Sequence, residues 1–292
     1  MKKMGFLLFF ALCIGLAVAY IAPTFQGKVE IQEYNQYEKI KLADIGIPKN
    51  IQQKEISKEQ VYQGNLLLVN SEYPVHPKSV RSDILDLFGH KELTKGYGIL
   101  DSEMKLSENV AQEFLKMISA AEKDGVHHFL INSGYRDLNK QREIYQKAGP
   151  DYALPAGYSE HNLGLSLDVG SSQMKMSEAP EGKWIEKNAW KYGFILRYPR
   201  DKIDITGIQY EPWHIRYVGL PHSAIMHKKN FALEEYLAYL KKEKIASAIV
   251  NGIKYTISYY FVSENMTIKV PKNNNYDISG NNIDGVIVTG YE

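Results

Sequence analysis

The stretch Ser159-Glu160-His161-Asn162-Leu163-Gly164-Leu165-Ser166-Leu167-Asp168 decides the fold. Gly164 predicts a turn after the histidine, and residues 165 to 169 then alternate between apolar and polar side chains. Such alternation predicts a β-strand with one buried face, and Ser166 and Asp168 share the opposite face. A loop histidine beside a strand aspartate can place both side chains on one metal ion. Taken alone, however, the stretch is more typical of a loop histidine and a strand aspartate that face solvent, and it indicates half of a metal site only when a second stretch supplies the rest.

A second stretch, Glu211-Pro212-Trp213-His214, supplies what the first one lacks. His214 and Arg216 alternate with apolar residues, which predicts another strand, and Pro212 suits its start because proline cannot donate to a ladder. In an ideal strand Glu211 and His214 would face opposite ways, so we predict a bend near Pro212 that brings both to one ion. Together the two stretches offer two imidazoles, one carboxylate ligand and one spare glutamate. That is the inventory of a catalytic zinc site.

Four motifs, in this order along the chain, resemble those of a known enzyme family. They are Ser133-Gly134-Tyr135-Arg136, Gln141, the stretch from 159 to 168 and the stretch from 211 to 214. The chain resembles the zinc D-alanyl-D-alanine carboxypeptidases, and most of all the VanY-type D,D-carboxypeptidases of glycopeptide-resistant bacteria, over roughly residues 59 to 243. The resemblance implies a hedgehog-like α+β fold: a central antiparallel sheet with helices on one face and the metal site in a groove on the other.

The resemblance also implies a role for each residue of the site. His161, Asp168 and His214 would bind zinc. Glu211 would be the general base that takes a proton from water and later gives it to the leaving amine. Arg136 would stabilise the oxyanion or bind the terminal carboxylate of the substrate.

Substrate contacts are expected from four side chains, Arg136, Gln141, Ser159 and Trp213. From the residues alone, Gln141 fits a solvated helix face equally well, and Ser159 fits an ordinary turn or cap. Arg136 follows a predicted strand and precedes a predicted helix, where side chains commonly face a site, although a surface arginine or a structural ion pair is equally compatible.

The resemblance implies removal of the terminal D-Ala from peptidoglycan stem peptides ending in D-Ala-D-Ala, and with it a part in cell-wall remodelling and vancomycin resistance. One alternative is a zinc endopeptidase of the cell wall, which could use the same ligands. Another is a non-catalytic wall-binding module with structural zinc. The spare Glu211 argues against that module, because a structural site is normally closed by a fourth ligand.

The N-terminus predicts a membrane anchor. Lys2 and Lys3 precede a run of nineteen uncharged residues, Met4 to Ala22, and at ~1.5 Å per residue such a helix spans a bilayer core of ~30 Å. The lysines would stay in the cytoplasm and the catalytic part would lie outside the cell membrane. The rival interpretation is a cleaved signal peptide, because Ala17-Val18-Ala19 is an A-x-A pattern. We favour the anchor because the run is longer than a usual signal core.

Composition and patterning divide the rest of the chain. With 35 basic and 34 acidic residues and no basic stripe, nucleic-acid binding is not expected. Cys13, the one cysteine, lies inside the apolar run, so the exported part forms no disulfide. We expect an anchor or signal over 1–23, a linker over 24–58, a zinc peptidase domain over 59–243 and a small β domain over 244–292.

The expected elements follow from periodicity, caps and turns. We predict a strand over 65–69 and helices over 107–123, 137–146, 181–192, 221–228 and 233–242. Further strands are predicted over 128–133 and 194–196. In the C-terminal part, Asn251-Gly252 is the turn of a tight hairpin, and strands are predicted over 267–270 and 285–289.

Overall fold

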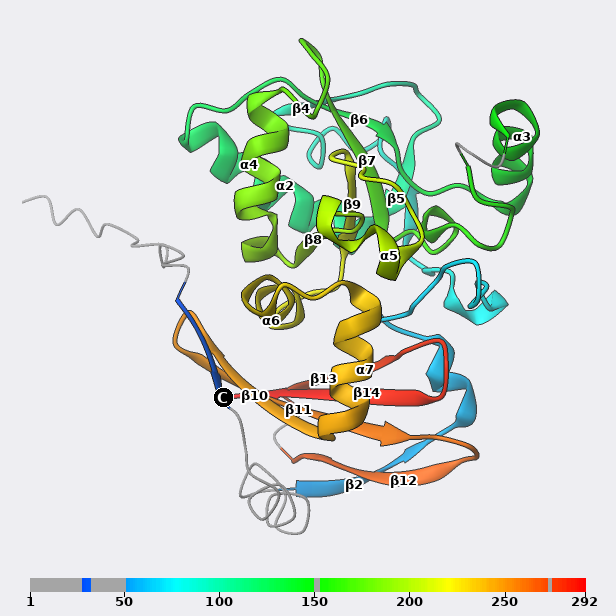
Figure 1. Ribbon diagram of the computed structural model, residues 1–292, viewed down its shortest axis with the longest axis vertical. Helices are drawn as coiled ribbons and strands as arrows, with labels where there is room; N and C mark the ends of the chain where they lie inside the picture. Colours follow the sequence, from blue (N-terminus) through cyan, green and yellow to red (C-terminus); the bar gives the residue numbers. More distant parts are fainter. Residues whose placement is uncertain (1–27, 33–50, 150–152, 273–274) are drawn as a thin grey trace, which may run out of the picture.

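The computed structural model describes residues 28–32, 51–149, 153–272 and 275–292. These residues form two lobes (Figure 1). The upper lobe comprises residues 77–219, and the β lobe comprises residues 28–32, 51–62 and 245–292. Helices α6 (His222–Lys229) and α7 (Leu233–Glu243) lie between the upper lobe and the main sheet of the β lobe. Both helices were predicted from the sequence.

A five-stranded sheet forms the centre of the upper lobe. Its strand order is β4 (Tyr97–Ile99), β6 (Phe129–Ser133), β7 (Ser166–Ser171), β9 (His214–Tyr217) and β8 (Phe194–Leu196). All neighbours are antiparallel except β4 and β6, which are parallel. The prediction of a purely antiparallel sheet is therefore wrong at this edge. The reason is the long helical connection between these two strands, which is the crossover that a parallel pair requires.

Helices cover the apolar face of this sheet. Helix α2 (Glu108–Lys123) begins at Ser107, whose hydroxyl accepts a hydrogen bond from Val110 N, and helix α4 (Pro180–Asn188) packs beside it. The helices and the sheet bury one continuous core, in which the Phe114 ring meets Tyr97 and Phe194 edge to face. Leu167 and Val169 of β7 contribute to this core, so the opposite face of the strand is left for polar side chains.

The remaining elements of the upper lobe are short or peripheral. Strands β3 (Ile84–Asp86) and β5 (Lys105–Ser107) pair with each other, and α3 (Leu138–Ala148) begins at the predicted cap, Asp137. Helix α5 spans Ile203–Thr206. The short 3-10 helices of this lobe are η2 (Pro77–Ser79), η3 (Glu160–Asn162), η4 (Ala189–Tyr192) and η5 (Arg200–Lys202), and η1 (Lys58–Tyr62) belongs to the β lobe.

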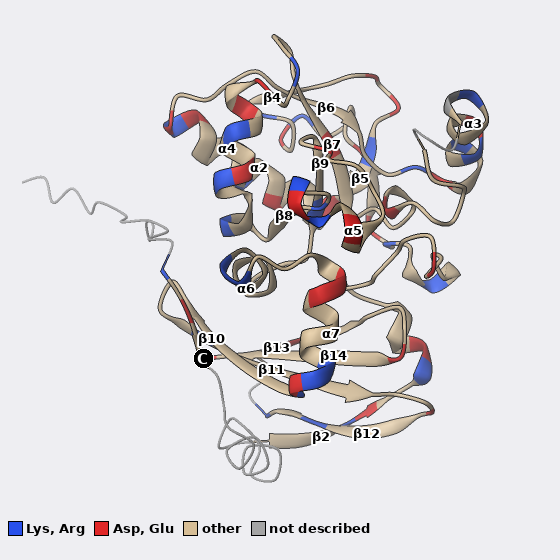
Figure 2. Ribbon diagram, in the orientation of Figure 1, with Lys and Arg blue, Asp and Glu red and all other residues tan. Residues whose placement is uncertain are grey.

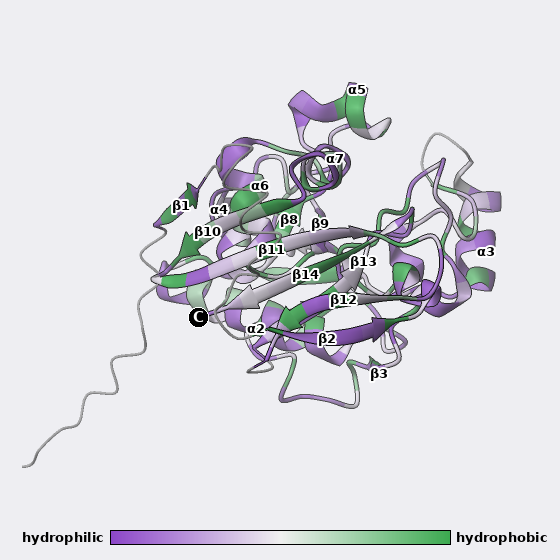
Figure 3. Ribbon diagram, turned by 90° about the horizontal axis from the view of Figure 1, so that it is seen from below, coloured by the Kyte–Doolittle hydropathy of each residue, from purple (hydrophilic) through white to green (hydrophobic). Residues whose placement is uncertain are grey.

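The β lobe contains two antiparallel sheets. The larger one has the order β1 (Val29–Gln32), β10 (Ile245–Val250), β11 (Ile253–Phe261), β14 (Gly285–Tyr291) and β13 (Tyr276–Gly280). The smaller one pairs β2 (Ile51–Ile56) with β12 (Met266–Pro271). Figure 3 shows these strands from below, with β10 coloured mainly as hydrophobic and β2 mainly as hydrophilic. The predicted Asn251-Gly252 hairpin is confirmed, because both residues have the positive φ of a type I′ turn.

Two stretches differ from what the sequence predicted. Within the expected linker over 24–58, the described residues contain strands β1 and β2, which pair with β10 and β12 of the C-terminal part. Over 65–69 the predicted strand is wrong: the residues are largely buried but form no ladder, and Leu68 N instead donates to the backbone carbonyl of Asn281. Long-range pairing decided both stretches, and local periodicity does not encode it.

The predicted anchor or signal over 1–23 lies outside the described residues. Among the residues that the structure describes, none belongs to a helix long and apolar enough to cross a membrane.

Candidate metal centre

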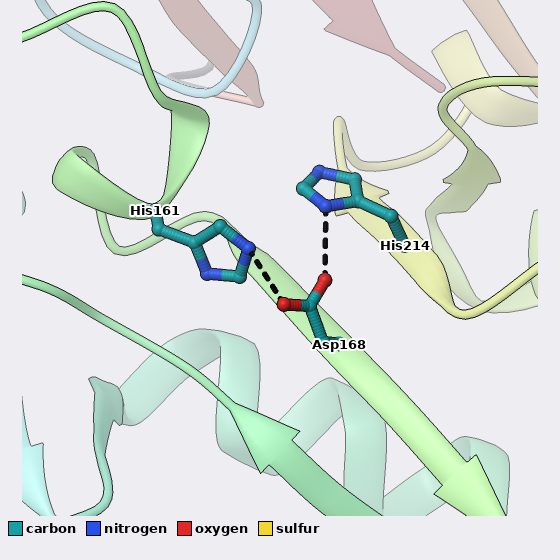
Figure 4. Close-up of side chains that lie close together, drawn as sticks. All are labelled: His161, Asp168 and His214. Atoms are coloured by element: carbon teal, nitrogen blue, oxygen red, sulfur yellow. Dashed lines mark hydrogen bonds and ion pairs between the residues drawn. The ribbon is translucent and has the colours of Figure 1, made fainter. Parts of the chain in front are cut away.

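Neighbouring strands place two of the predicted ligands opposite each other. Asp168 on β7 and His214 on β9 are direct partners in the antiparallel register, so their side chains project from the same face of the sheet. His161 comes from η3, the short helical turn before β7, and reaches the same point (Figure 4). The side chain of Ser159 caps η3 by accepting a hydrogen bond from His161 N. The structure therefore brings together the three residues that the sequence singled out as ligands.

The three side chains form a compact set. His214 Nδ1 lies 3.0 Å from Asp168 Oδ1, and His161 Nε2 lies 3.2 Å from Asp168 Oδ2 (Figure 4). One ligand atom from each residue lies within 4.8 Å of the other two. His161 Nε2 and His214 Nε2 are both buried, and neither makes a hydrogen bond of good geometry in the described part of the chain. Two imidazoles and one carboxylate, with the buried His161 Nε2 lacking a hydrogen-bond partner, are a ligand set that fits a zinc ion.

The backbone of Gly134 orients His161. Its carbonyl oxygen lies 2.6 Å from His161 Nδ1, and because a carbonyl can only accept, that nitrogen carries the proton. Nε2 is thus the nitrogen left with a lone pair for an ion. A side chain at position 134 would collide with the backbone, since its Cβ would lie 2.3 Å from Lys105 O. This close approach explains the glycine in Ser133-Gly134-Tyr135-Arg136.

Arg136 reaches the centre from the corner between β6 and α3. Its Nη2 lies 3.3 Å from Asp168 Oδ2, and its Nη1 donates to Gln141 Oε1 at 2.9 Å. The amide nitrogen of Gln141 donates to Leu154 O at 2.7 Å, so both ends of this buried side chain are engaged within the protein. Gln141 therefore braces Arg136, and Arg136 Nε is buried with no hydrogen-bond partner in the described residues.

The predicted bend near Pro212 is confirmed. His214 N donates to Glu211 O at 3.3 Å in a turn, and the turn brings Glu211 Oε2 to 3.8 Å from His214 Nδ1. Burial raises the pKa of the Glu211 carboxyl above its usual value, although His214 acts in the opposite direction. Trp213, between them, is 40% exposed at the surface. Glu211 is thus near the ligands without being one of the three that converge.

Without a bound metal ion, the carboxylates determine the charge state of the histidines in the centre. Burial acts against ionisation of Asp168, but His161 and His214 outweigh it and hold the pKa of this carboxyl well below its usual range. Burial also opposes charge on His214, yet Asp168 and Glu160 raise the pKa of its imidazole to about 9. The carboxylates therefore attract a positive charge to this position, whether a proton or a metal ion.

Sequence reasoning missed a buried ionic cluster next to the centre. Glu160 is 1% exposed, and its Oε1 accepts hydrogen bonds from Arg197 Nε at 2.9 Å and Arg216 Nη1 at 2.7 Å. Burial would raise the pKa of Glu160, but Arg216 and Arg197 hold it well below its usual range. A signal was present: Arg216 lies two residues after His214 in one strand, so both occupy one face.

The comparisons with known proteins agree on one family. Residues 103–220 match the model of the VanY family of D-alanyl-D-alanine carboxypeptidases. A D-alanyl-D-alanine carboxypeptidase of Enterococcus faecium is 62% identical over 291 residues, which cover 99% of this chain and 96% of the relative.

Two solved structures are also similar. The vancomycin resistance D,D-dipeptidase VanXYg, in complex with a D-Ala-D-Ala phosphinate analogue, shares 32% identity at a TM-score of 0.73, over 83% of this chain and 99% of that one. A glutamate-to-alanine variant of the D,D-pentapeptidase VanY from a VanB-type resistance cassette, in complex with Zn(II), shares 30% identity at a TM-score of 0.50, over 59% of this chain and 98% of that one. The chain belongs to the VanY family and is a D-alanyl-D-alanine carboxypeptidase.

Proposed function

We propose that this carboxypeptidase is a zinc enzyme that removes the terminal D-Ala from peptidoglycan stem peptides ending in D-Ala-D-Ala. His161, Asp168 and His214 would hold the ion. The observation that carries the proposal is the convergence of three ligand atoms within 4.8 Å, next to a fourth side chain, the carboxyl group of Glu211, which is not part of the converging set. Three protein ligands leave a position open, as catalytic zinc sites require. The related VanY structure in complex with Zn(II) supports the choice of metal.

Glu211 is the proposed general base. Zinc, when bound, lowers the pKa of water to ~7 and polarises a carbonyl group. Glu211 would take the proton of the attacking water and later deliver it to the leaving amine. Its raised pKa suits both steps, because a base whose pKa lies nearer the working pH also serves as an acid. Its position beside His214, without convergence on the ligand atoms, separates this role from that of a ligand.

Arg136 is the proposed electrostatic stabiliser. Gln141 and Asp168 hold its guanidinium from two sides, so the charge is in place before substrate arrives. A preorganised cation in a buried site stabilises developing negative charge without a cost of reorganisation. The group would serve the oxyanion or the terminal carboxylate of the substrate. Trp213, exposed at the rim, and Ser159, at the base of η3, are the further proposed substrate contacts.

Location outside the cell membrane is part of the proposal. It rests on the apolar run from Met4 to Ala22 behind two lysines. Strand β1 begins at Val29, and six residues intervene between the run and this strand. Six extended residues reach at most about 20 Å. An anchored enzyme would therefore hold its β lobe close to the bilayer, where peptidoglycan precursors are presented, and cleavage there would contribute to wall remodelling and vancomycin resistance.

Mass spectrometry of a stem pentapeptide incubated with the full chain tests the function. Loss of one alanine, abolished by a zinc chelator and restored by zinc, is the expected result. Loss of a dipeptide or cuts within the peptide would indicate a different zinc peptidase. An unchanged pentapeptide in the presence of zinc would contradict the proposal.

A further inference from the structure

The two histidines of the centre differ in what holds their second ring nitrogen. His161 is held by a backbone carbonyl, 2.6 Å from its Nδ1. His214 turns Nδ1 toward Asp168 Oδ1 at 3.0 Å and Nε2 toward Glu160 Oε2 at 3.5 Å. Both nitrogens of His214 therefore face carboxylate oxygens. A histidine that binds a metal ion is neutral, and the location of its one ring proton decides which nitrogen has the lone pair for the ion.

We propose that Glu160 is a positioning residue, whose carboxylate accepts the Nε2 proton of His214 and so leaves Nδ1 free to bind the metal ion beside Asp168. The inference rests on the proposed function, in which His161, Asp168 and His214 hold zinc. Metal-binding histidines almost always donate their other N–H to a carboxylate, carbonyl or water, and loss of that partner typically costs about 10- to 100-fold in metal affinity. Glu160 Oε2 lies 3.5 Å from His214 Nε2, beyond a hydrogen bond of good geometry, and it occupies for His214 the place that the Gly134 carbonyl occupies for His161.

The environment of Glu160 leaves one oxygen for this task. Arg197 and Arg216 both donate to Oε1, at 2.9 and 2.7 Å. From the residues that the structure describes, Oε2 accepts one longer bond, from Ser166 Oγ at 3.3 Å, and it is the oxygen that faces His214. The side chain is fully buried, so solvent does not compete for Oε2. The arginines thus fix the carboxylate in the orientation that serves His214.

Both arginines also make hydrogen bonds to groups other than Glu160. Arg197 binds Glu234 of α7 through two hydrogen bonds, at 3.0 and 2.7 Å. Arg216 Nη2 donates to the backbone carbonyls of Asn65 and Leu67, at 3.0 and 2.8 Å. The two arginines balance the charges of Glu160 and Glu234. The cluster is therefore a neutral support in which every guanidinium nitrogen donates a hydrogen bond, and it connects the metal centre to α7.

Stability alone is a poor explanation for this cluster. A buried ion pair is often no more stabilising than apolar residues of similar volume, because desolvation offsets the attraction. What distinguishes Glu160 from Glu234 is the ligand that it faces. Both carboxylates bind Arg197, but Glu160 also lies against His214. A comparison of Glu160 with Glu234 can therefore distinguish a positioning role toward His214 from a structural role toward Arg197.

Cadmium-113 NMR on the full wild-type chain, with ¹⁵N-labelled histidine, provides the first test. Coupling between cadmium and a ring nitrogen identifies the bound atom. We expect coupling to Nε2 of His161 and Nδ1 of His214, with a proton on Nε2 of His214. Coupling to Nε2 of His214 would overturn the positioning role and leave the metal centre intact. Lack of coupling to either histidine would overturn the metal centre itself, and the inference with it.

The second test compares Glu160→Gln with the matched control Glu234→Gln. Each substitution removes the negative charge of one carboxylate that pairs with Arg197, and both are expected to lower Tm. Zinc affinity, measured by competition with a chelator, should fall about 10- to 100-fold in Glu160→Gln alone. If zinc affinity falls equally in both variants, or falls in neither, Glu160 has no positioning role and is a structural residue. If Glu160→Gln does not fold, the NMR assignment on the wild-type chain still decides.

Discussion

The upper lobe buries charged side chains, whereas the polar side chains that the β lobe buries are uncharged. The sheet of the upper lobe carries charge into its interior, where Glu160, Arg197 and Arg216 lie beside the metal centre. In the β lobe, strands β10 and β14 contain no charged residue, and Figure 2 shows both as almost uniformly uncharged ribbons. The first lobe therefore retains a desolvation cost that the second avoids. Buried charge marks the lobe that performs chemistry.

Two buried histidines make the same contrast at the level of single residues. His214, on β9, faces carboxylates, which raise the pKa of its imidazole to about 9. His222, at the start of α6, contacts Tyr236 OH at 2.7 Å and Thr289 Oγ1 at 3.0 Å. These neutral hydroxyls do not stabilise a cation, and burial lowers the pKa of His222 to about 3. The neighbours, not the burial, assign one imidazole to the metal centre and the other to packing between the lobes.

Removal of a ligand should have the largest effect. His214→Ala removes one of three zinc ligands, and a catalytic site left with two should hold zinc poorly and lose nearly all turnover. The measurements are metal content after dialysis and hydrolysis of the pentapeptide. His222→Ala, which removes the other buried imidazole, is the control and should retain zinc. Full zinc occupancy in His214→Ala would remove His214 from the ligand set.

Removal of the base should give the next largest effect. Glu211→Gln keeps the size of the side chain but cannot accept a proton, so turnover should fall by at least ~100-fold while zinc stays bound. Rates are compared with metal content in the same samples. In the wild type, burial raises the pKa of Glu211, so activity should be lost, as pH falls, above the usual pKa of a glutamate. Loss of zinc in Glu211→Gln would make Glu211 a ligand.

The sequence predicted the metal centre better than it predicted the fold around it. The ligands lie in two short local motifs, so the alternation around Asp168, the proline before His214 and the family resemblance of both motifs together singled out residues that the structure brings side by side. Glu160 was missed because its partners, Arg197 and Arg216, lie far along the chain, and only the strand register brings them together.

Strands β1 and β2 were missed for a related reason. They are short and contain exposed polar residues, and each is defined by its pairing with the C-terminal part rather than by its own periodicity. Helix α2, by contrast, has its cap and its apolar stripe within the one stretch from Ser107 to Lys123, and its predicted bounds are confirmed.

His222, which is neutral in the folded chain, predicts how the free energy of unfolding changes as pH falls. The pKa of His222 is about 3 in the folded chain and 6.5 in the unfolded chain, so the unfolded state binds the proton first as pH falls below 6.5. Stability is therefore complete above pH 6.5 and is lost as pH falls from 6.5 toward 3, by about 2 kcal/mol at pH 5.

Denaturant unfolding at pH 7.5 and pH 5 measures this loss. His222→Gln, which can still bond Tyr236 and Thr289 but does not titrate, should lose about 2 kcal/mol less than wild type over the same interval. Identical losses in the two proteins would show that His222 is not the group responsible.

The smallest expected effect concerns the hairpin of the β lobe, and it tests whether that lobe contributes to the chemistry. Gly252 has φ +82° with nothing within 4 Å of an added Cβ, so Gly252→Ala costs only backbone strain, about 1 kcal/mol. Gly125, which follows α2 in the upper lobe, has φ +75° and is equally open, and it is the matched site.

Both alanine variants should lower Tm by a few degrees, as measured by calorimetry, and Gly252→Asn should lower it less because asparagine tolerates this conformation. The value of kcat/KM should remain at the wild-type level in all three, since neither turn contacts the metal centre. A Gly252→Ala variant with normal zinc content but reduced kcat/KM would show that the β lobe acts on the site, and the functional distinction between the lobe with buried charge and the lobe without it would have to be abandoned.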